Sequence, residues 1–241
     1  MFSYSVYVLF GILPSFLWLL YYLKKDTNPE PKVKILKVFI GGAISAIFAA
    51  LIEILLLKNV FQVNNCPWLP YWVSLLYVFL IVALIEETLK YLAVKIIIFR
   101  DMHFDEPIDS MIYLITSAMG FAALENVLLF FSEGMSPTDT FLVAIFRFLG
   151  ATFLHALCSG IFGFFISLSF TKIRKRKILF LVGFSTAVLL HAAYNFSIIQ
   201  LNSIFKFVLP ACVLMCLMFF LSIGVRKLKN TKSICKIQEK S

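Results

Sequence analysis

Apolar runs of about twenty residues recur along nearly the whole of this 241-residue chain, separated only by short loops. Hydrophobic residues make up 61% of the chain and charged residues 15%, far from the balance of a soluble domain. A helix of about twenty apolar residues is long enough to cross the hydrocarbon core of a bilayer. The sequence therefore predicts an all-α polytopic transmembrane helical bundle, in which any chemistry takes place inside the bundle.

The basic residues predict how this bundle is oriented. Of the 22 Lys and Arg, 18 fall in loops on one side, two fall on the other side, and Lys90 and Arg147 lie within spans. By the positive-inside rule, the N-terminus faces out and the C-terminus faces in. The loops also account for the net charge of +9, so we expect no nucleic-acid partner. Residues 1–225 are expected to form one transmembrane domain and 226–241 a basic cytoplasmic tail. The seven predicted spans are 4–23, 35–57, 71–98, 108–132, 140–170, 178–201 and 204–225.

Several of these spans carry polar side chains that lipid does not favour. A central Asp, Lys or Arg costs about 2.5 to 3.5 kcal/mol on insertion scales, so a group of them in one bundle calls for a function. Four adjacent spans, the third to the sixth, contribute. The residues are Glu86, Glu87, Lys90, Glu125, Asn126, Arg147, His155, His191 and Asn195.

The spacing of the charged residues in the third span predicts a paired site. Lys90 follows Glu86 by four residues and Glu87 by three, so one helical face can hold the ammonium and both carboxylates. Two adjacent carboxylates repel each other in a low dielectric, and one of them can accept a proton from water. Glu86 or Glu87 is therefore a candidate general base.

The histidines and their neighbours predict the rest of a catalytic site. His191 and Asn195 are one helical turn apart and can donate hydrogen bonds to a developing oxyanion. His155 can orient a water molecule or bind a metal, and Arg147 is a candidate counter-ion for a carboxylate. Glu53, near the outer end of the second span, is interpreted as a structural residue that reaches toward the interface.

Other interpretations of the same residues stay open from the residues alone. A Glu-Lys pair in a buried helix is often only structural, and Glu125 and Asn126 can simply join helices. A proton-coupled transporter would use the same Glu and His residues as a proton relay. A purely structural scaffold would leave these residues dispersed in space.

At these residues the sequence resembles the PrsW family of intramembrane proteases, which is distantly related to the CPBP family of CAAX-processing proteases. The resemblance covers nearly the whole chain. The sequence departs from the CPBP pattern at two motifs. The CPBP motif EExxxR is here EExxK, and the CPBP motif FxxxH is here Phe121-xxx-Glu125. Because the histidine of the second motif is absent, the water-orienting histidine is expected to be His155. The shared motifs are E-E-T-L-K at Glu86 to Lys90, F-D-E-P-I-D at Phe104 to Asp109, G-F-A-A-L-E-N at Gly120 to Asn126, H-A-L at His155 and H-A-A-Y-N at His191 to Asn195.

The resemblance implies a multi-pass protease of the bacterial cell membrane. Its implied substrate is a single-span anti-sigma factor, cut first on its extracytoplasmic side in an envelope-stress response. The implied catalytic residues are Glu86, Glu87, Glu125, His155, His191 and Asn195, supported by Lys90, Asn126 and Arg147. PrsW-like proteins are also grouped with metallopeptidases, which makes Glu87, Glu125, His155 and His191 candidate zinc ligands. The chain has no HExxH motif, so a metal is not fixed by the sequence.

Overall fold

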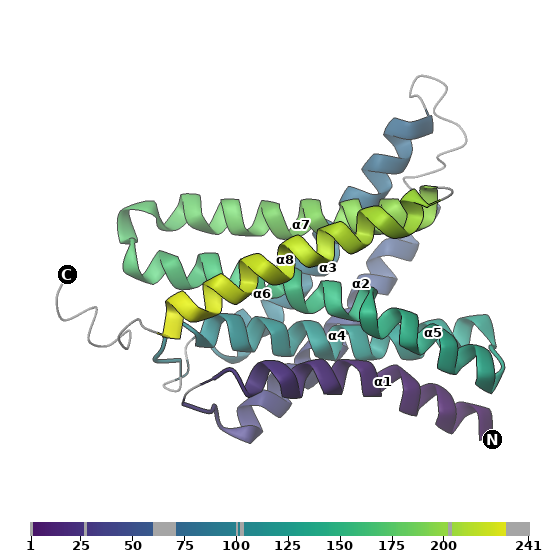
Figure 1. Cartoon of the computed structure of the whole chain (residues 1–241), viewed down its shortest axis with the longest axis horizontal. Coiled ribbons are helices and arrows are strands. Elements are labelled where there is room, and N and C mark those ends of the chain that lie inside the picture. The colour runs from purple at the N-terminus through teal and green to yellow at the C-terminus, as the bar shows by residue number, and fades with distance from the viewer. Residues whose placement is uncertain are drawn as a thin grey trace.

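A computed structural model describes residues 2–26, 28–59, 71–99, 101, 104–201 and 204–229 of the chain. Within these residues the structure is helical and has no strand, as expected for a chain whose backbone polar groups must pair within each span (Figure 1). The helices are α1 (Phe2–Leu23), α2 (Lys32–Asn59), α3 (Tyr71–Ile97), α4 (Asp109–Glu133), α5 (Pro137–Leu149), α6 (Ala151–Thr171), α7 (Arg176–Gln200) and α8 (Phe205–Lys229), with a short 3₁₀ turn at Ile173–Lys175.

The prediction of a polytopic helical bundle is confirmed. Among the described residues, six segments are long and apolar enough to cross a membrane, and α5 and α6 together form one of them. The helix outside these six is α3, which contacts α2, α4 and α7 and carries Glu86, Glu87 and Lys90. The bundle thus contains seven elements at the predicted positions, one of which carries most of the buried charge.

The predicted span at 140–170 is present as one segment from Pro137 to Thr171, but it is not a continuous helix. The chain breaks at Gly150, whose backbone angles of φ −111° and ψ −99° are not helical, so α5 ends at Leu149 and α6 starts at Ala151. A Cβ at Gly150 would collide with the hydroxyl of Tyr194 on α7 and would lie 2.9 Å from the carbonyl oxygen of Phe146, so glycine lets these groups approach the break. The helical boundary at the other end also differs from the prediction, since α8 continues to Lys229 rather than ending at 225.

Helix α4 is the centre of the bundle. In its most apolar stretch 67% of the residues are buried inside the bundle, and the helix contacts α1, α2 and α6. Its crossing with α2 is close because two glycines meet there: a Cβ on Gly120 would collide with the backbone of Phe39, and a Cβ on Gly42 with that of Ser117. Small residues that let backbones approach are a common means of helix association in membranes.

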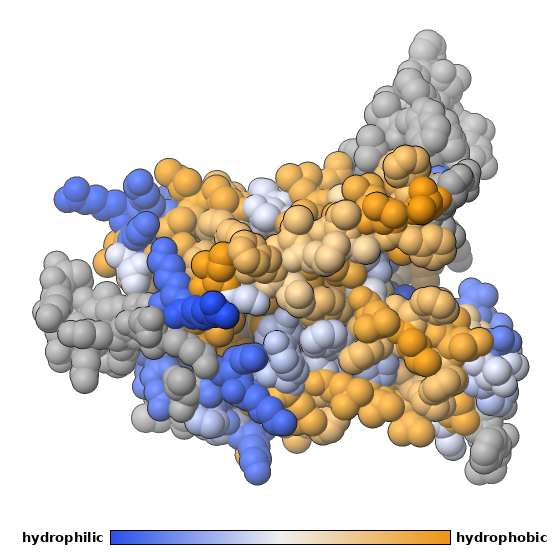
Figure 2. Space-filling model, in the orientation of Figure 1, coloured by the Kyte–Doolittle hydropathy of each residue, from blue (hydrophilic) through white to orange (hydrophobic). Residues whose placement is uncertain are grey.

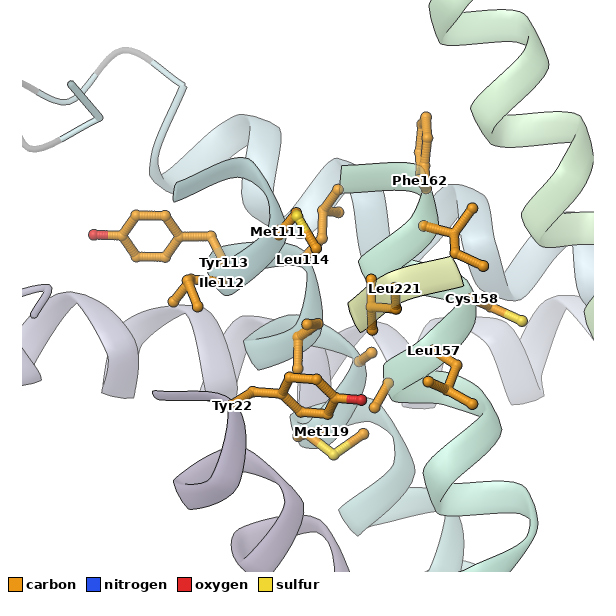
Figure 3. Packing of buried hydrophobic residues seen from close by; sticks show 14 of the residues in the cluster. Tyr22, Met111, Ile112, Tyr113, Leu114, Met119, Leu157, Cys158, Phe162 and Leu221 are labelled. Atoms are coloured by element: carbon orange, nitrogen blue, oxygen red, sulfur yellow. The ribbon is translucent and has the colours of Figure 1, made fainter. Parts of the chain in front are cut away.

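The apolar core lies between α4 and α6 and is closed by α1 and α8. Figure 3 shows Leu157 and Phe162 of α6 beside Met111 and Leu114 of α4, with Leu221 of α8 entering the same cluster. The outer surface is apolar through its middle, and hydrophilic residues gather at the end where α6 passes into α7 (Figure 2). That distribution suits a bundle surrounded by lipid.

Candidate active site

The charged residues of α3 form a tight ion cluster. Nζ of Lys90 lies 2.8 Å from Oε1 of Glu87 and 3.1 Å from Oε2 of Glu86. The Lys90 side chain is fully buried, and its ammonium also sits 4.3 Å from the centre of the Phe121 ring. The predicted pairing of one ammonium with both carboxylates is therefore present.

His155 on α6 joins this cluster to α4. Its Nδ1 lies 2.7 Å from Nζ of Lys90, and its Nε2 lies 2.9 Å from Oε2 of Glu125. An ammonium can only donate hydrogen bonds, so Nδ1 accepts and the ring proton is on Nε2, where it is donated to Glu125. Lys90 and Glu125 together fix the tautomer of this histidine.

His191 on α7 is held from the opposite side. Its Nδ1 lies 2.9 Å from Oε1 of Glu87, and its Nε2 lies 3.7 Å from Oε2 of Glu86. The rings of His155 and His191 stand at 88° with their centres 4.9 Å apart. Three helices thus bring two imidazoles and two carboxylates around one small volume.

Arg147 and Asn126 form the outer part of the network. Nη2 of Arg147 lies 2.7 Å from Oε1 of Glu125, and its Nε donates to the side-chain oxygen of Asn126. The Asn126 amide in turn donates to the carbonyl of Gly11 on α1 and to the hydroxyl of Thr152 on α6. The prediction that Arg147 neutralises a carboxylate is met by this geometry, and Asn126 ties three helices to it.

The exposed fraction of the side chains in the network is highest at Glu125 and lowest at Glu87 and Lys90. The side chain of Glu125 is 36% exposed and that of Arg147 18%, whereas Glu87 is 1% exposed. The network is therefore most exposed beside Glu125 and most buried at Glu87 and the imidazoles. Glu125 lies eight residues before Glu133 at the end of α4, which is about 12 Å along the helix axis. Under the predicted topology, this end of α4 is the outer one.

Glu86, His155 and His191 are a possible metal-binding group, since their ligand atoms all lie within 4.8 Å of one another. Oε2 of Glu86 is 3.9 Å from Nδ1 of His155 and 3.7 Å from Nε2 of His191. Ligands of a tetrahedral zinc are about 3.4 Å apart, so a small contraction would suffice. The remaining imidazole nitrogens each contact a second carboxylate, Glu125 or Glu87, which is the usual support for a metal-bound histidine.

The donor set therefore fits a metal such as zinc, with a difference from the sequence expectation. Glu86 offers a ligand atom to the possible metal. Glu87 and Glu125, which were predicted as candidate ligands, instead contact the imidazoles of His191 and His155. Lys90 must leave Nδ1 of His155 for that nitrogen to reach a metal, because the ammonium uses the same lone pair.

One predicted catalytic residue lies apart from the network. Asn195 is half-buried on α7, and among the described residues none lies within hydrogen-bonding distance of its amide. Two further side chains join the site. Ser159, which no sequence pattern singled out, contacts Oε2 of Glu87 at 3.3 Å. Phe121, named from the sequence only as part of the Phe121-xxx-Glu125 motif, lies under Lys90. Ser159 lies one helical turn from His155, and Phe121 one turn from Glu125.

Glu53 on α2 also lies near the site, and its structural role stays a prediction. Its carboxyl interacts electrostatically with Glu86, Glu125 and Lys90. Its Oε1 is buried with no hydrogen-bond partner among the described residues. A fourth carboxyl therefore faces the site from α2.

Comparison with known proteins points the same way as the site. Residues 30–225 match the model of a family described as PrsW family intramembrane metalloprotease. A protein named Protease PrsW from Bacillus subtilis (strain 168) is 29% identical over 95% of this chain and 96% of its own length. The Protease PrsW of Clostridioides difficile (strain 630) is 30% identical over 78% of this chain and 77% of its own length. No solved structure matches the chain.

Proposed function

Because this chain belongs to the PrsW family of intramembrane metalloproteases, and is thus a multi-pass bacterial membrane peptidase, we propose that it makes the first cut in a single-span anti-sigma factor. The cut falls near the extracytoplasmic end of the substrate span and starts an envelope-stress response. The observation that carries the chemistry is the group of Glu86, His155 and His191, in which each imidazole is oriented by a second carboxylate.

Glu86 is the residue that activates water in this proposal. Both oxygens of Glu87 are occupied, one by Lys90 and His191 and the other by Ser159. Glu86 receives only the 3.1 Å contact from Lys90 on Oε2, and its side chain is 9% exposed. A general base needs an oxygen that can reach the substrate water, which favours Glu86 over its neighbour.

If a divalent metal is bound, Glu86, His155 and His191 are the residues that would hold it. A bound zinc would then polarise the attacking water and the scissile carbonyl in place of a free Glu86 carboxylate. Glu87 holds His191 and Glu125 holds His155, so that each imidazole offers one unprotonated nitrogen to the same volume. Arg147 keeps Glu125 in place, and Lys90 balances the charge of the two α3 carboxylates.

His191 and Asn195, both predicted from the sequence as oxyanion donors, have different roles in this proposal. Both nitrogens of His191 face carboxylates, so this imidazole contributes to water activation rather than to an oxyanion site. Asn195 is half-buried one turn further along α7 than His191. Its amide is free to bind an oxyanion once a substrate is present.

The substrate enters beside Glu125 and Arg147, where the network is most exposed. A peptide bond has to leave helical structure before water can attack it, and residues at the outer end of a span do so most readily. The comparisons do not favour the transporter interpretation, since the family and the relatives are proteases.

The proposal is tested with the full chain purified and reconstituted in liposomes with a single-span anti-sigma factor. We expect Glu86→Gln and His191→Ala to lose cleavage by about 10²- to 10⁴-fold, the usual effect of removing a general base. Leu84→Ala, a change to a 44% exposed residue on the same helix, is the matched control and retains activity.

Metal dependence is tested in the same assay. A chelator should abolish cleavage, and added zinc should restore it to the wild-type protein but not to His191→Ala. Full activity in both active-site variants would refute the assigned site. A cut at the cytoplasmic end of the substrate would refute the proposed order of proteolysis.

A further inference from the structure

A cavity lies at the end of the bundle where α6 passes into α7. Its volume is about 550 Å³, and it is bounded by the end of α3, the end of α6 and the first turns of α7. The aromatic side chains of Tyr91, Phe99, Phe170 and Phe180 form its walls, and Tyr91 contacts the Phe180 ring with centres 5.2 Å apart. The proteolytic mechanism uses none of these residues.

Three cations surround this aromatic cavity. Lys95 comes from α3, and Arg176 and Lys177 come from the start of α7. The Lys95 ammonium lies 5.9 Å from the ring centre of Tyr91, and the Arg176 guanidinium 5.8 Å from that of Phe170. None of the described residues that line the cavity is acidic. The first turn of α7 also has no acidic residue, so its dipole adds to the positive potential.

The surroundings of the cavity are those of a membrane surface. Leu181 on its rim is 60% exposed, and Ile178 and Ile96 nearby are 62% and 80% exposed. Such large aliphatic side chains face lipid in a bundle of this kind. The same end of the molecule carries the hydrophilic residues between α6 and α7 (Figure 2). An apolar wall next to a cluster of cations matches a ligand with an anionic head and an apolar tail.

We propose that Lys95, Arg176 and Lys177 over Tyr91, Phe99, Phe170 and Phe180 form a binding site for an anionic phospholipid of the cytoplasmic leaflet. The phosphate lies among the three cations, and an acyl chain follows the aromatic wall toward Leu181. Basic pockets between helices on the cytoplasmic side are suited to acidic headgroups. The site shares no residue with the protease network, which lies earlier on α3 and later on α7.

The test uses the full chain in a neutral detergent with dioleoyl phosphatidylglycerol or dioleoyl phosphatidylcholine as the probe. Binding is measured by native mass spectrometry and by the shift in the unfolding midpoint. We expect phosphatidylglycerol to bind and phosphatidylcholine to bind at least tenfold more weakly, since each nearby cation contributes about fivefold. The variant K95Q/R176Q/K177Q should bind phosphatidylglycerol at least tenfold more weakly than the wild type.

The control variant K172Q/R174Q/K175Q removes the same charge from exposed residues of the same loop that do not line the cavity. It should keep most of the affinity. Equal weakening by both triple variants would overturn the site in favour of general surface attraction. If inorganic phosphate raised the unfolding midpoint as much as phosphatidylglycerol does, the proposal of a lipid ligand would be overturned. Should the triple variant fail to fold, R176Q alone serves, and unchanged phosphatidylglycerol binding by R176Q would equally overturn the site.

Discussion

Nζ of Lys90 lies 2.7 Å from Nδ1 of His155, the nitrogen that a metal held by Glu86 and His191 would also use. The ammonium and a metal therefore compete for one lone pair. Lys90 stabilises the cluster when no metal is bound, because it neutralises two adjacent buried carboxylates.

Replacing Lys90 by Met should destabilise the protein and strengthen its response to zinc. Removing one partner of a buried ion pair typically costs about 3–5 kcal/mol, since the remaining charges are left uncompensated. The measurement is the unfolding midpoint with and without zinc. We expect a lower midpoint than wild type without zinc and a larger rise when zinc is added. An equal rise in both proteins would show that Lys90 and the metal do not compete.

Replacing Arg147 by Gln should slow cleavage without unfolding the protein. The guanidinium holds Glu125 and Asn126 together, and Glu125 in turn orients His155. Loss of such a supporting contact typically costs 10- to 100-fold in activity or metal affinity. Arg147→Lys should not restore the rate, because one ammonium cannot reproduce the fork of the guanidinium. Phe146→Ala, at a 72% exposed neighbour, is the control.

Replacing Gly120 by Ala should separate α2 from α4. The new methyl group would meet the backbone of Phe39, which cannot move as a flexible side chain can. Overpacking of this kind typically costs about 1–3 kcal/mol. The unfolding midpoint should fall, and so should activity, since α2 carries Glu53 to the site. Ile44→Ala, at a 48% exposed position on α2, should leave both unchanged.

Replacing Glu30 by Gln should reduce the pH dependence of stability at the predicted cytoplasmic end. Burial raises the pKa of Glu30, although the Tyr113 hydroxyl, 2.5 Å from its Oε2, opposes this. A raised pKa means that the folded state holds the proton more tightly than the unfolded chain. Stability from this group is therefore present below the ordinary Glu pKa of about 4.3 and is lost as the pH rises through the folded value.

The measurement is the unfolding midpoint of wild type and Glu30→Gln across that pH range. The wild-type curve should fall more steeply above pH of about 4.3 than the curve of the variant. Parallel curves would show that Glu30 contributes nothing to the pH dependence. Glu106→Gln, on the same side of the bundle, is a matched change in charge.

The sequence alone determined the bundle and most of the residues that meet in the candidate site. In lipid, a long apolar run must be helical, because a helix pairs its own backbone N–H and C=O groups. The span positions could therefore be predicted from the sequence. Glu86, Glu87, Lys90, His155 and His191 stood out because a polar group in lipid is costly wherever its span lies. The i to i+4 spacing even gave the Lys90 pairing, since that contact is made within one helix.

Only the tertiary structure decided how the helices bring these residues together. The break at Gly150 leaves no room for a Cβ beside the hydroxyl of Tyr194, 44 residues away, and this neighbour cannot be read from the local sequence. The choice of Glu86 over Glu87 as the residue facing both imidazoles, and the approach of Glu53 from α2, depend on helix rotation and crossing. Helix rotation and helix crossing are both determined by packing between segments that are distant in the sequence. The sequence of a single helix therefore does not predict them.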